Sequence, residues 1–124
     1  MDRITILFVD DDDLIRGAYV DLLRDEGFSV VEASDGCEAL EAATTICGEV
    51  LLVLDEEMPR MRGSAVLELL DRRSDAPRFR VVIISGYGNA EVYTVPRRGI
   101  RVQAVVPKPF TADELLSTLH RLAA

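Results

Sequence analysis

Apolar runs alternate with amphipathic segments along the whole chain. Short runs rich in Val, Ile and Leu predict strands over residues 4–9, 28–33, 50–54, 81–84 and 102–106. Between them, apolar residues recur at helical spacing and predict helices over 14–25, 35–47, 63–73 and 111–124. Three of the strand runs, 4–9, 50–54 and 81–84, are continuously apolar, which is typical of parallel strands that are covered on both faces.

This alternation predicts one α/β domain over residues 1–124, with a doubly wound, five-stranded parallel sheet. The segment between the fourth and fifth strands has the weakest pattern. The run 92–95 consists of poor helix formers and Pro96 breaks any helix that they start, so a helix within 88–99 is expected to be short or irregular. Ligands of such sheets bind beyond the carboxyl ends of the strands, and the residues at those ends are therefore the candidate site.

Four consecutive aspartates, Asp10 to Asp13, follow the first strand. Two carboxylates about 4 Å apart repel by roughly 4 kcal/mol at an effective dielectric of about 20, and a bound cation would relieve that repulsion. Carboxylates prefer hard ions, so Mg2+ is the first expectation and Mn2+ the second. The same block also suits an acidic loop that leads into a helix, with Asp12 or Asp13 as the N-cap.

The other strand ends deliver a carboxylate, a hydroxyl and an ammonium. Asp55 ends the third strand, Ser85 ends the fourth, and Lys108 follows the fifth. Lys108 is the only lysine among 14 basic residues, and lysine offers a compact point charge where arginine offers a wide planar fork. These groups suit phosphoryl transfer to a carboxylate. Asp55 would be the nucleophile, a metal would neutralise phosphoryl oxygens, and Ser85 and Lys108 would bind the remaining oxygens.

Four motifs stand in order at successive strand ends. They are Ile6-Leu7-Phe8-Val9-Asp10-Asp11, Leu54-Asp55 with Met58-Pro59 and Gly63, Val82-Ile83-Ile84-Ser85-Gly86, and Lys108-Pro109-Phe110. In these motifs, and over its whole length, the chain resembles the receiver domains of response regulators in two-component signalling. The resemblance implies a flavodoxin-like fold with strand order 2-1-3-4-5 and five flanking helices. The sequences Ser85-Gly86-Tyr87-Gly88 and Pro107-Lys108-Pro109-Phe110 are similar to those of receivers that are attached to hybrid histidine kinases.

The resemblance also implies a role for each site residue. Asp55 would accept a phosphoryl group from the phosphohistidine of a histidine kinase or a phosphotransfer domain. Mg2+ would be held by Asp55, by Asp11 directly, by Asp10 through a water, and by the backbone carbonyl of Glu57. The domain would catalyse its own phosphorylation and dephosphorylation, and its conformation would switch toward an output partner that the sequence does not identify.

One position departs from the family pattern. The family usually has Tyr or Phe three residues before the lysine and couples that ring to the Ser/Thr hydroxyl, whereas this chain has Val105. Val105 is too small to act as a moving ring. We therefore expect phosphorylation to change how well ordered the segment 86–99 is, and we expect Tyr87 or Tyr93 to respond to phosphorylation. Tyr87 is also expected to shield the phosphoryl group from water.

Two other functions fit part of the pattern. A haloacid-dehalogenase-like phosphatase would use Asp10 as its nucleophile, with Asp12, Ser85 and Lys108 in supporting motifs, but it leaves Asp55 without a role. A receiver-shaped interaction module would never be phosphorylated, and the complete set of site residues argues against it. Locating the phosphorylated aspartate separates the three functions.

Charge and hydropathy narrow the partners. The chain carries a formal net charge of −8, which argues against unaided binding to nucleic acid or to an anionic membrane. No apolar run approaches the roughly 20 residues of a membrane-spanning helix, and the first residues lack the basic start and apolar stretch of a signal peptide. We therefore expect a cytoplasmic location. Cys37 and Cys47 are interpreted as small core residues.

Overall fold

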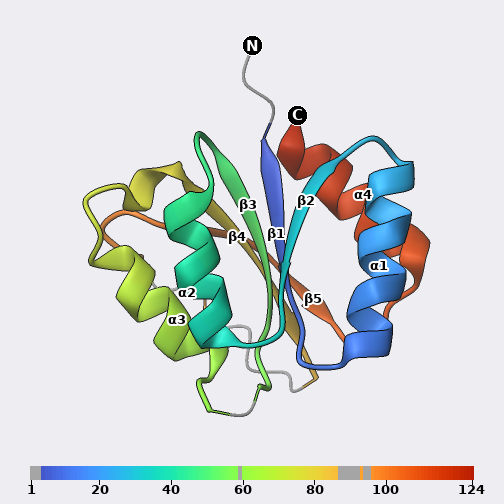
Figure 1. Ribbon diagram of the computed structural model, residues 1–124, viewed down its shortest axis with the longest axis horizontal. Coiled ribbons are helices and arrows are strands. Elements are labelled where there is room, and N and C mark those ends of the chain that lie inside the picture. Colours follow the sequence, from blue (N-terminus) through green and yellow to red (C-terminus); the bar gives the residue numbers. More distant parts are fainter. Residues whose placement is uncertain (1–3, 59, 87–92, 94–95) are drawn as a thin grey trace.

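A parallel sheet forms the centre of the structure. The computed structural model describes residues 4–58, 60–86, 93 and 96–124. Within these residues the strands are β1 Thr5–Val9, β2 Ser29–Ala33, β3 Val50–Asp55, β4 Phe79–Ser85 and β5 Arg101–Pro107. They pair in the order β2-β1-β3-β4-β5, and every pair is parallel (Figure 1). The predicted doubly wound sheet and its strand order are confirmed.

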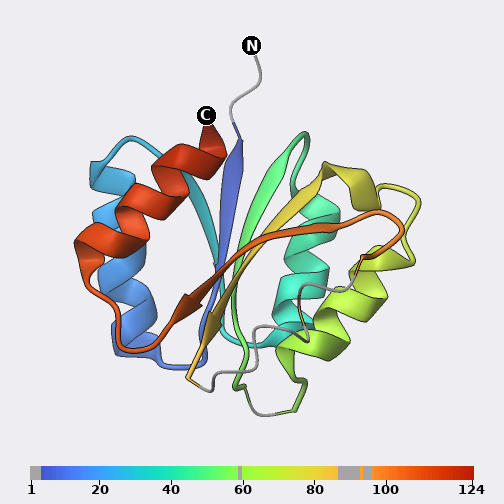
Figure 2. The ribbon, with the colours of Figure 1, turned by 180° about the vertical axis from the view of Figure 1, so that it is seen from behind.

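Helices cover both faces of this sheet. The described part of the chain holds α1 Asp13–Asp25, α2 Gly36–Thr45, α3 Gly63–Asp71 and α4 Ala112–Ala123, with a short 3-10 helix, η1, at Ala76–Arg78. The pair α1 and α4 lies against one face and the pair α2 and α3 against the other, as Figures 1 and 2 show from opposite sides. Among the residues described, none of the helices has the length and apolar character that a bilayer span requires.

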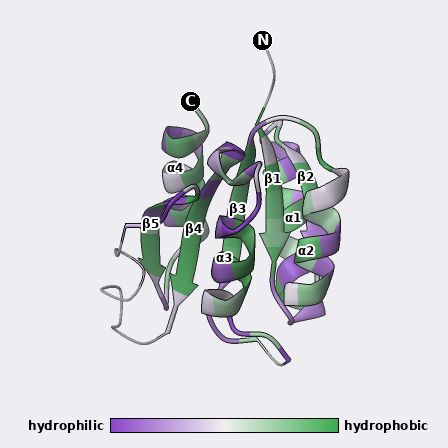
Figure 3. Cartoon of the chain, turned by 90° about the vertical axis from the view of Figure 1, so that its left-hand side faces the viewer, coloured by the Kyte–Doolittle hydropathy of each residue, from purple (hydrophilic) through white to green (hydrophobic). Residues whose placement is uncertain are grey.

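Alternate side chains of the central strands enter two separate cores, one under each helix layer. In β1 and β3, Leu7 and Leu52 pack toward α2 and α3, while Ile6 and Leu51 pack toward α1 and α4. All four side chains are fully buried, which explains why these strands appear in the sequence as unbroken apolar runs. Figure 3 shows the strands as hydrophobic bands between helices with mixed surfaces.

The number of helices differs from the expected five. The residues that the structure describes contain four α-helices and the η1 turn. The short helix expected within 88–99 falls largely on positions 87–92 and 94–95, which lie outside the described residues, as do Tyr87 and Pro59. Tyr93 is described, and it is buried.

Asp12 begins α1 as its N-cap. Its carboxylate accepts hydrogen bonds from the backbone N–H groups of Leu14 (3.0 Å) and Ile15 (3.1 Å). The N-cap interpretation of the aspartate run therefore holds for Asp12. It does not account for Asp10 and Asp11, which precede the cap.

Both cysteines are exposed, so their interpretation as core residues is wrong. Cys37 lies in the first turn of α2, whose buried residues are Gly36, Ala39 and Ala43. The phase of the helix therefore turns Cys37 away from the core. Cys47 lies beyond the last residue of the helix.

The carboxylate of Asp71, the last residue of α3, fixes the chain that leads into β5. It accepts hydrogen bonds from the backbone N–H groups of Gly99 (2.7 Å), Ile100 (3.1 Å) and Arg98 (3.2 Å). Burial acts to raise the pKa of this carboxyl, but the three hydrogen bonds outweigh burial and hold the pKa below its usual range. The fold therefore stabilises the ionised form.

We expect Asp71→Ala to lower the free energy of unfolding by about 1–3 kcal/mol at neutral pH, because hydrogen bonds to a charged acceptor are lost. The difference from the unchanged protein should shrink below about pH 4, since the folded-state pKa lies below the unfolded one and protonation removes the charge. Urea unfolding at neutral and at acid pH measures both effects. Glu68→Ala, an exposed carboxylate on the same helix, is the control and should cost less than about 0.5 kcal/mol. Equal losses in the two variants would contradict this role of Asp71.

Candidate functional site

The carboxyl ends of two neighbouring strands bring acidic side chains together at one edge of the sheet. Asp10 and Asp11 follow β1, and Asp55 is the last residue of β3, which pairs with β1. Carboxylate oxygens of the three residues lie within 4.8 Å of one another. Asp10 and Asp55 are buried, whereas Asp11 is exposed. The structure therefore places the three aspartates predicted as metal ligands in one cluster.

Backbone hydrogen bonds orient the two buried carboxylates. Oδ1 of Asp10 accepts the N–H of Asp12 at 2.9 Å, and Oδ1 of Asp55 accepts the N–H of Glu57 at 3.0 Å. Burial raises the pKa of the Asp10 carboxyl, the bond from Asp12 opposes that rise, and the charges of Asp55 and Asp11 add to it. Hard oxygen donors that are this close, with mutual repulsion to relieve, fit a divalent cation such as Mg2+.

Lys108 supplies a positive charge to the same cluster. Its Nζ lies 3.0 Å from Oδ2 of Asp55, and its backbone N–H donates to the carbonyl of Ser85 at 2.8 Å. Burial acts to lower the pKa of the Lys108 ammonium, but the bond to Asp55 and the charges of nearby carboxylates outweigh burial and raise it. Lys108 is therefore a fixed cation at the carboxylate predicted to be the nucleophile.

A cleft of about 670 Å³ opens beside these side chains. Its polar residues include Asp10, Asp11, Asp55, Glu57 and Lys108. Aromatic and aliphatic side chains form the rest of its lining, among them Phe8, Ile15, Tyr19 and Phe110. The predicted position of Glu57 at the site is thus consistent with the geometry, while its role as a metal ligand stays a prediction.

Ser85 ends β4 as predicted, but its hydroxyl is directed toward Glu56. The residue is buried, and its Oγ donates to Oε2 of Glu56 at 2.5 Å. The described residues that line the cleft do not include Ser85. Sequence reasoning missed Glu56 as the partner of this hydroxyl. The only available signal was a carboxylate directly after a fully buried strand.

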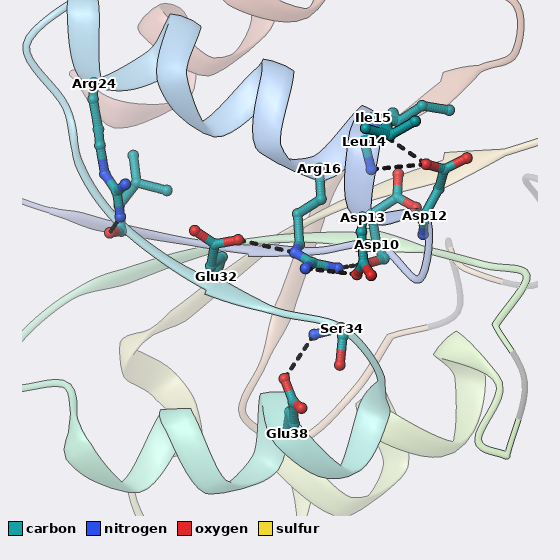
Figure 4. Close-up of polar contacts among 11 residues, drawn as sticks. Asp10, Asp12, Asp13, Leu14, Ile15, Arg16, Arg24, Glu32, Ser34 and Glu38 are labelled. Carbon is teal, nitrogen blue, oxygen red and sulfur yellow. Dashed lines mark hydrogen bonds and ion pairs between the residues drawn. The ribbon is translucent and has the colours of Figure 1, made fainter.

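Arg16 is a second residue that sequence reasoning missed (Figure 4). From α1, its Nη1 donates to the backbone carbonyl of Asp10 at 2.8 Å, its Nε donates to Oε1 of Glu32 at 3.0 Å, and its Nη2 lies 2.8 Å from Oδ1 of Asp13. Its side chain is only 13% exposed. Arg16 therefore holds the turn between β1 and α1 that carries the acidic cluster.

Known proteins share both this sequence pattern and this fold. The family model of the response regulator receiver domain matches residues 6–120. The sensor kinase CckA of Brucella abortus is 34% identical over 122 residues, which are 95% of this chain and 12% of the kinase. Across three of the curated relatives that it matches, the chain spans between 12% and 25% of their length.

Two solved structures agree with the fold over nearly the whole chain. The chemotaxis response regulator CheY4 of Vibrio cholerae has a TM-score of 0.82 and 27% identity, covering 98% of this chain and 99% of CheY4. The response regulator TrrA of Thermotoga maritima, solved in complex with Mg(2+)-BeF, has a TM-score of 0.76 and 25% identity, covering 98% of this chain and 99% of TrrA. The match over residues 6–120, together with the confirmed strand order, shows that the chain belongs to the response regulator receiver domain family of two-component systems.

Proposed function

We propose that Asp55 is the phosphoacceptor of this receiver domain and takes its phosphoryl group from the phosphohistidine of a histidine kinase or a phosphotransfer domain. One observation carries the proposal: the buried Asp55 carboxylate lies 3.0 Å from the Lys108 ammonium and adjoins two further aspartates. A nucleophile, a fixed cation and a group of hard oxygen ligands thus meet at one point of the cleft. Phosphoryl transfer depends mainly on this kind of positioning and electrostatic stabilisation.

The proposed transfer breaks the P–N bond of the donor and forms a P–O bond to a carboxylate oxygen of Asp55. The imidazole leaves with the electron pair of the broken bond and takes up a proton, and Asp55 becomes an acyl phosphate. Lys108 already contacts the Asp55 carboxylate and is proposed to pair with a phosphoryl oxygen after transfer. Ser85 is proposed to donate its hydroxyl proton to another phosphoryl oxygen.

We further propose that Asp10, Asp11 and Asp55, with the backbone carbonyl of Glu57, hold Mg2+; Mn2+ shares its preference for hard oxygen ligands. When bound, the ion supplies positive charge to the phosphoryl oxygens. Asp10 is fixed by its burial and by the N–H of Asp12, whereas Asp11 projects into solvent. This combination suits an ion that retains several waters.

The proposed location of the domain is the cytoplasm. Its proposed partners are proteins: the phosphoryl donor before the transfer and an output partner after it. The net charge of −8 disfavours direct contact with nucleic acid or with an anionic membrane.

Incubation with a small phosphodonor and Mg2+, followed by mapping of the modified peptide, tests the proposal. A single phosphate on Asp55, labile to hydroxylamine as an acyl phosphate is, is the expected result. A phosphate on Asp10 would instead support the phosphatase, and no labelling under any metal condition would support the interaction module.

Arg16→Ala is expected to slow Mg2+-dependent phosphorylation by roughly 10–100-fold, the usual loss when a partner that orients metal ligands is removed. The physical reason is that the Asp10 carbonyl loses its donor and the turn that carries Asp10 and Asp11 loosens. Initial rates at several Mg2+ concentrations measure the effect.

Arg24→Ala is the matched control for Arg16→Ala. Arg24 lies on the same helix and also donates to a backbone carbonyl, that of Val30, but on strand β2 and away from the aspartates (Figure 4). It should retain the rate of the unchanged protein. Equal slowing in both variants would show a general effect on α1 and not a specific effect on the site.

A further inference from the structure

Two buried hydroxyls from different parts of the chain donate to one carboxylate, that of Glu56. Ser85, at the end of β4, donates to Oε2 of Glu56 at 2.5 Å. The hydroxyl of Tyr93 also hydrogen-bonds to Glu56. Ser85 and Tyr93 are 3% and 2% exposed. Glu56 itself is tied to β4, because its backbone N–H donates to the carbonyl of Ile84 at 2.9 Å.

The Ser85 hydroxyl has one proton to donate. While that proton is directed to Glu56, it is not available to a phosphoryl oxygen on Asp55, the residue that precedes Glu56 in the sequence. An O–H···O⁻ bond of 2.5 Å is within the short range of charge-assisted bonds, which are the stronger class. Glu56 therefore competes with the phosphoryl group for the same donor.

Tyr93 connects this competition to the core. Its ring belongs to the buried cluster beneath α2 and α3, which includes Ile83 of β4. Burial, together with the bond to Glu56, raises the pKa of the Tyr93 hydroxyl, so the phenol stays protonated and acts as the donor. A change in the position or hydrogen bonding of Glu56 thus alters the environment of a core ring.

We propose that Glu56 is a positioning residue that holds the Ser85 hydroxyl until Asp55 is phosphorylated, and that release of this hydroxyl is transmitted through Glu56 to Tyr93. The inference rests on the proposed function. After transfer, the Ser85 hydroxyl donates to the phosphoryl group instead of to Glu56. The phosphoryl group repels the negatively charged Glu56 carboxylate, which keeps its hydrogen bond to Tyr93. Tyr93 then replaces the ring that Val105 is too small to supply.

The competition is tested by binding of beryllofluoride, a phosphoryl mimic, in the presence of Mg2+, followed by fluorine NMR. Glu56→Ala should tighten binding by roughly tenfold, the factor that corresponds to about 1.4 kcal/mol, because the competing acceptor is gone. Most of that gain should vanish in the Ser85→Ala background, where there is no hydroxyl to release. The charge effect of removing Glu56 is common to both backgrounds and cancels in the comparison.

Glu56→Gln serves as a second variant that retains an acceptor oxygen and the side-chain volume. For each variant, the gain in beryllofluoride affinity measured in the Ser85→Ala background is subtracted from the gain measured with Ser85 present. The remaining gain should be smaller for Glu56→Gln than for Glu56→Ala. Equal gains from Glu56→Ala with and without the Ser85 hydroxyl would overturn the positioning role.

Transmission is followed by NMR of labelled tyrosine rings, with Tyr93→Phe identifying the Tyr93 signals. Beryllofluoride should shift the Tyr93 signals in the unchanged protein. In Ser85→Ala saturated with beryllofluoride, the shift should be about half as large or smaller. A shift of the same size in both proteins would overturn the transmission. Absence of beryllofluoride binding to the unchanged protein would overturn the proposed function as well, so the two failures are distinguishable.

Discussion

Asp55→Asn is expected to abolish labelling by a small phosphodonor and to leave the fold intact. The amide preserves the shape of the carboxylate but is not a nucleophile, so no acyl phosphate can form. Intact mass after incubation with the donor and Mg2+ measures the loss. Asp21→Asn, an exposed aspartate on α1, is the control and should be labelled as well as the unchanged protein.

Two opposing electrostatic effects determine the stability of Asp55→Asn. The variant loses the ion pair with Lys108, whose side chain is 39% exposed, so that solvent screens part of the attraction. It also removes one of three carboxylates that lie within 4.8 Å of one another. We therefore expect the free energy of unfolding to change by less than about 1 kcal/mol. Labelling that persists in a folded Asp55→Asn protein would assign the phosphate to another residue and contradict the proposal.

The cluster of Asp10, Asp55 and Lys108 could be predicted because parallel strands deliver their following residues to the same edge of a sheet. Unbroken apolar runs marked β1, β3 and β4, and each site residue stands at the end of a run or just beyond the last strand. The strand order came from the resemblance to receiver domains. Apolar patterning alone does not distinguish 2-1-3-4-5 from other orders of the same strands.

The contacts of Glu56 and Arg16 could not be predicted, because no periodicity encodes a side-chain contact between separate segments. Glu56 and Ser85 are 29 residues apart, and Arg16 and Glu32 are 16 apart. The first contact depends on the register of β3 and β4, and the second on the packing of α1 against β2; a propensity argument supplies neither. The error at Cys37 had a different origin: the buried residues Ala39 and Ala43 recur at helical spacing, and that spacing leaves position 37 on another face of the helix.

The four consecutive aspartates separate into different roles once their partners are known. Asp12 caps α1, and Asp13 lies 2.8 Å from Nη2 of Arg16. Asp10 and Asp11 join Asp55 in the cluster proposed to hold Mg2+. The sequence offered capping and metal binding as alternatives for the block, and the geometry divides the residues between them.

Two neighbouring variants, Asp11→Asn and Asp12→Asn, distinguish the metal-binding role from the capping role. Asp11→Asn should weaken Mg2+ binding by roughly 30-fold or more, because one charge about 4 Å from a doubly charged ion is already worth that factor in a water-like dielectric and a direct ligand lies nearer. Phosphorylation at limiting Mg2+ should fall by a similar factor. Mg2+ titrations of the phosphorylation rate measure both the affinity and the maximal rate.

Asp12→Asn removes the same charge one residue later in the same turn. Asn is as good an N-cap as Asp, so α1 should keep its start and its stability. We expect this variant to retain most of the Mg2+ affinity, because the carboxylate of Asp12 is directed to the N–H groups of Leu14 and Ile15. If Asp12→Asn weakened Mg2+ binding as much as Asp11→Asn, the ion would be responding to the total charge of the turn, and the assignment of Asp11 as a ligand would be wrong.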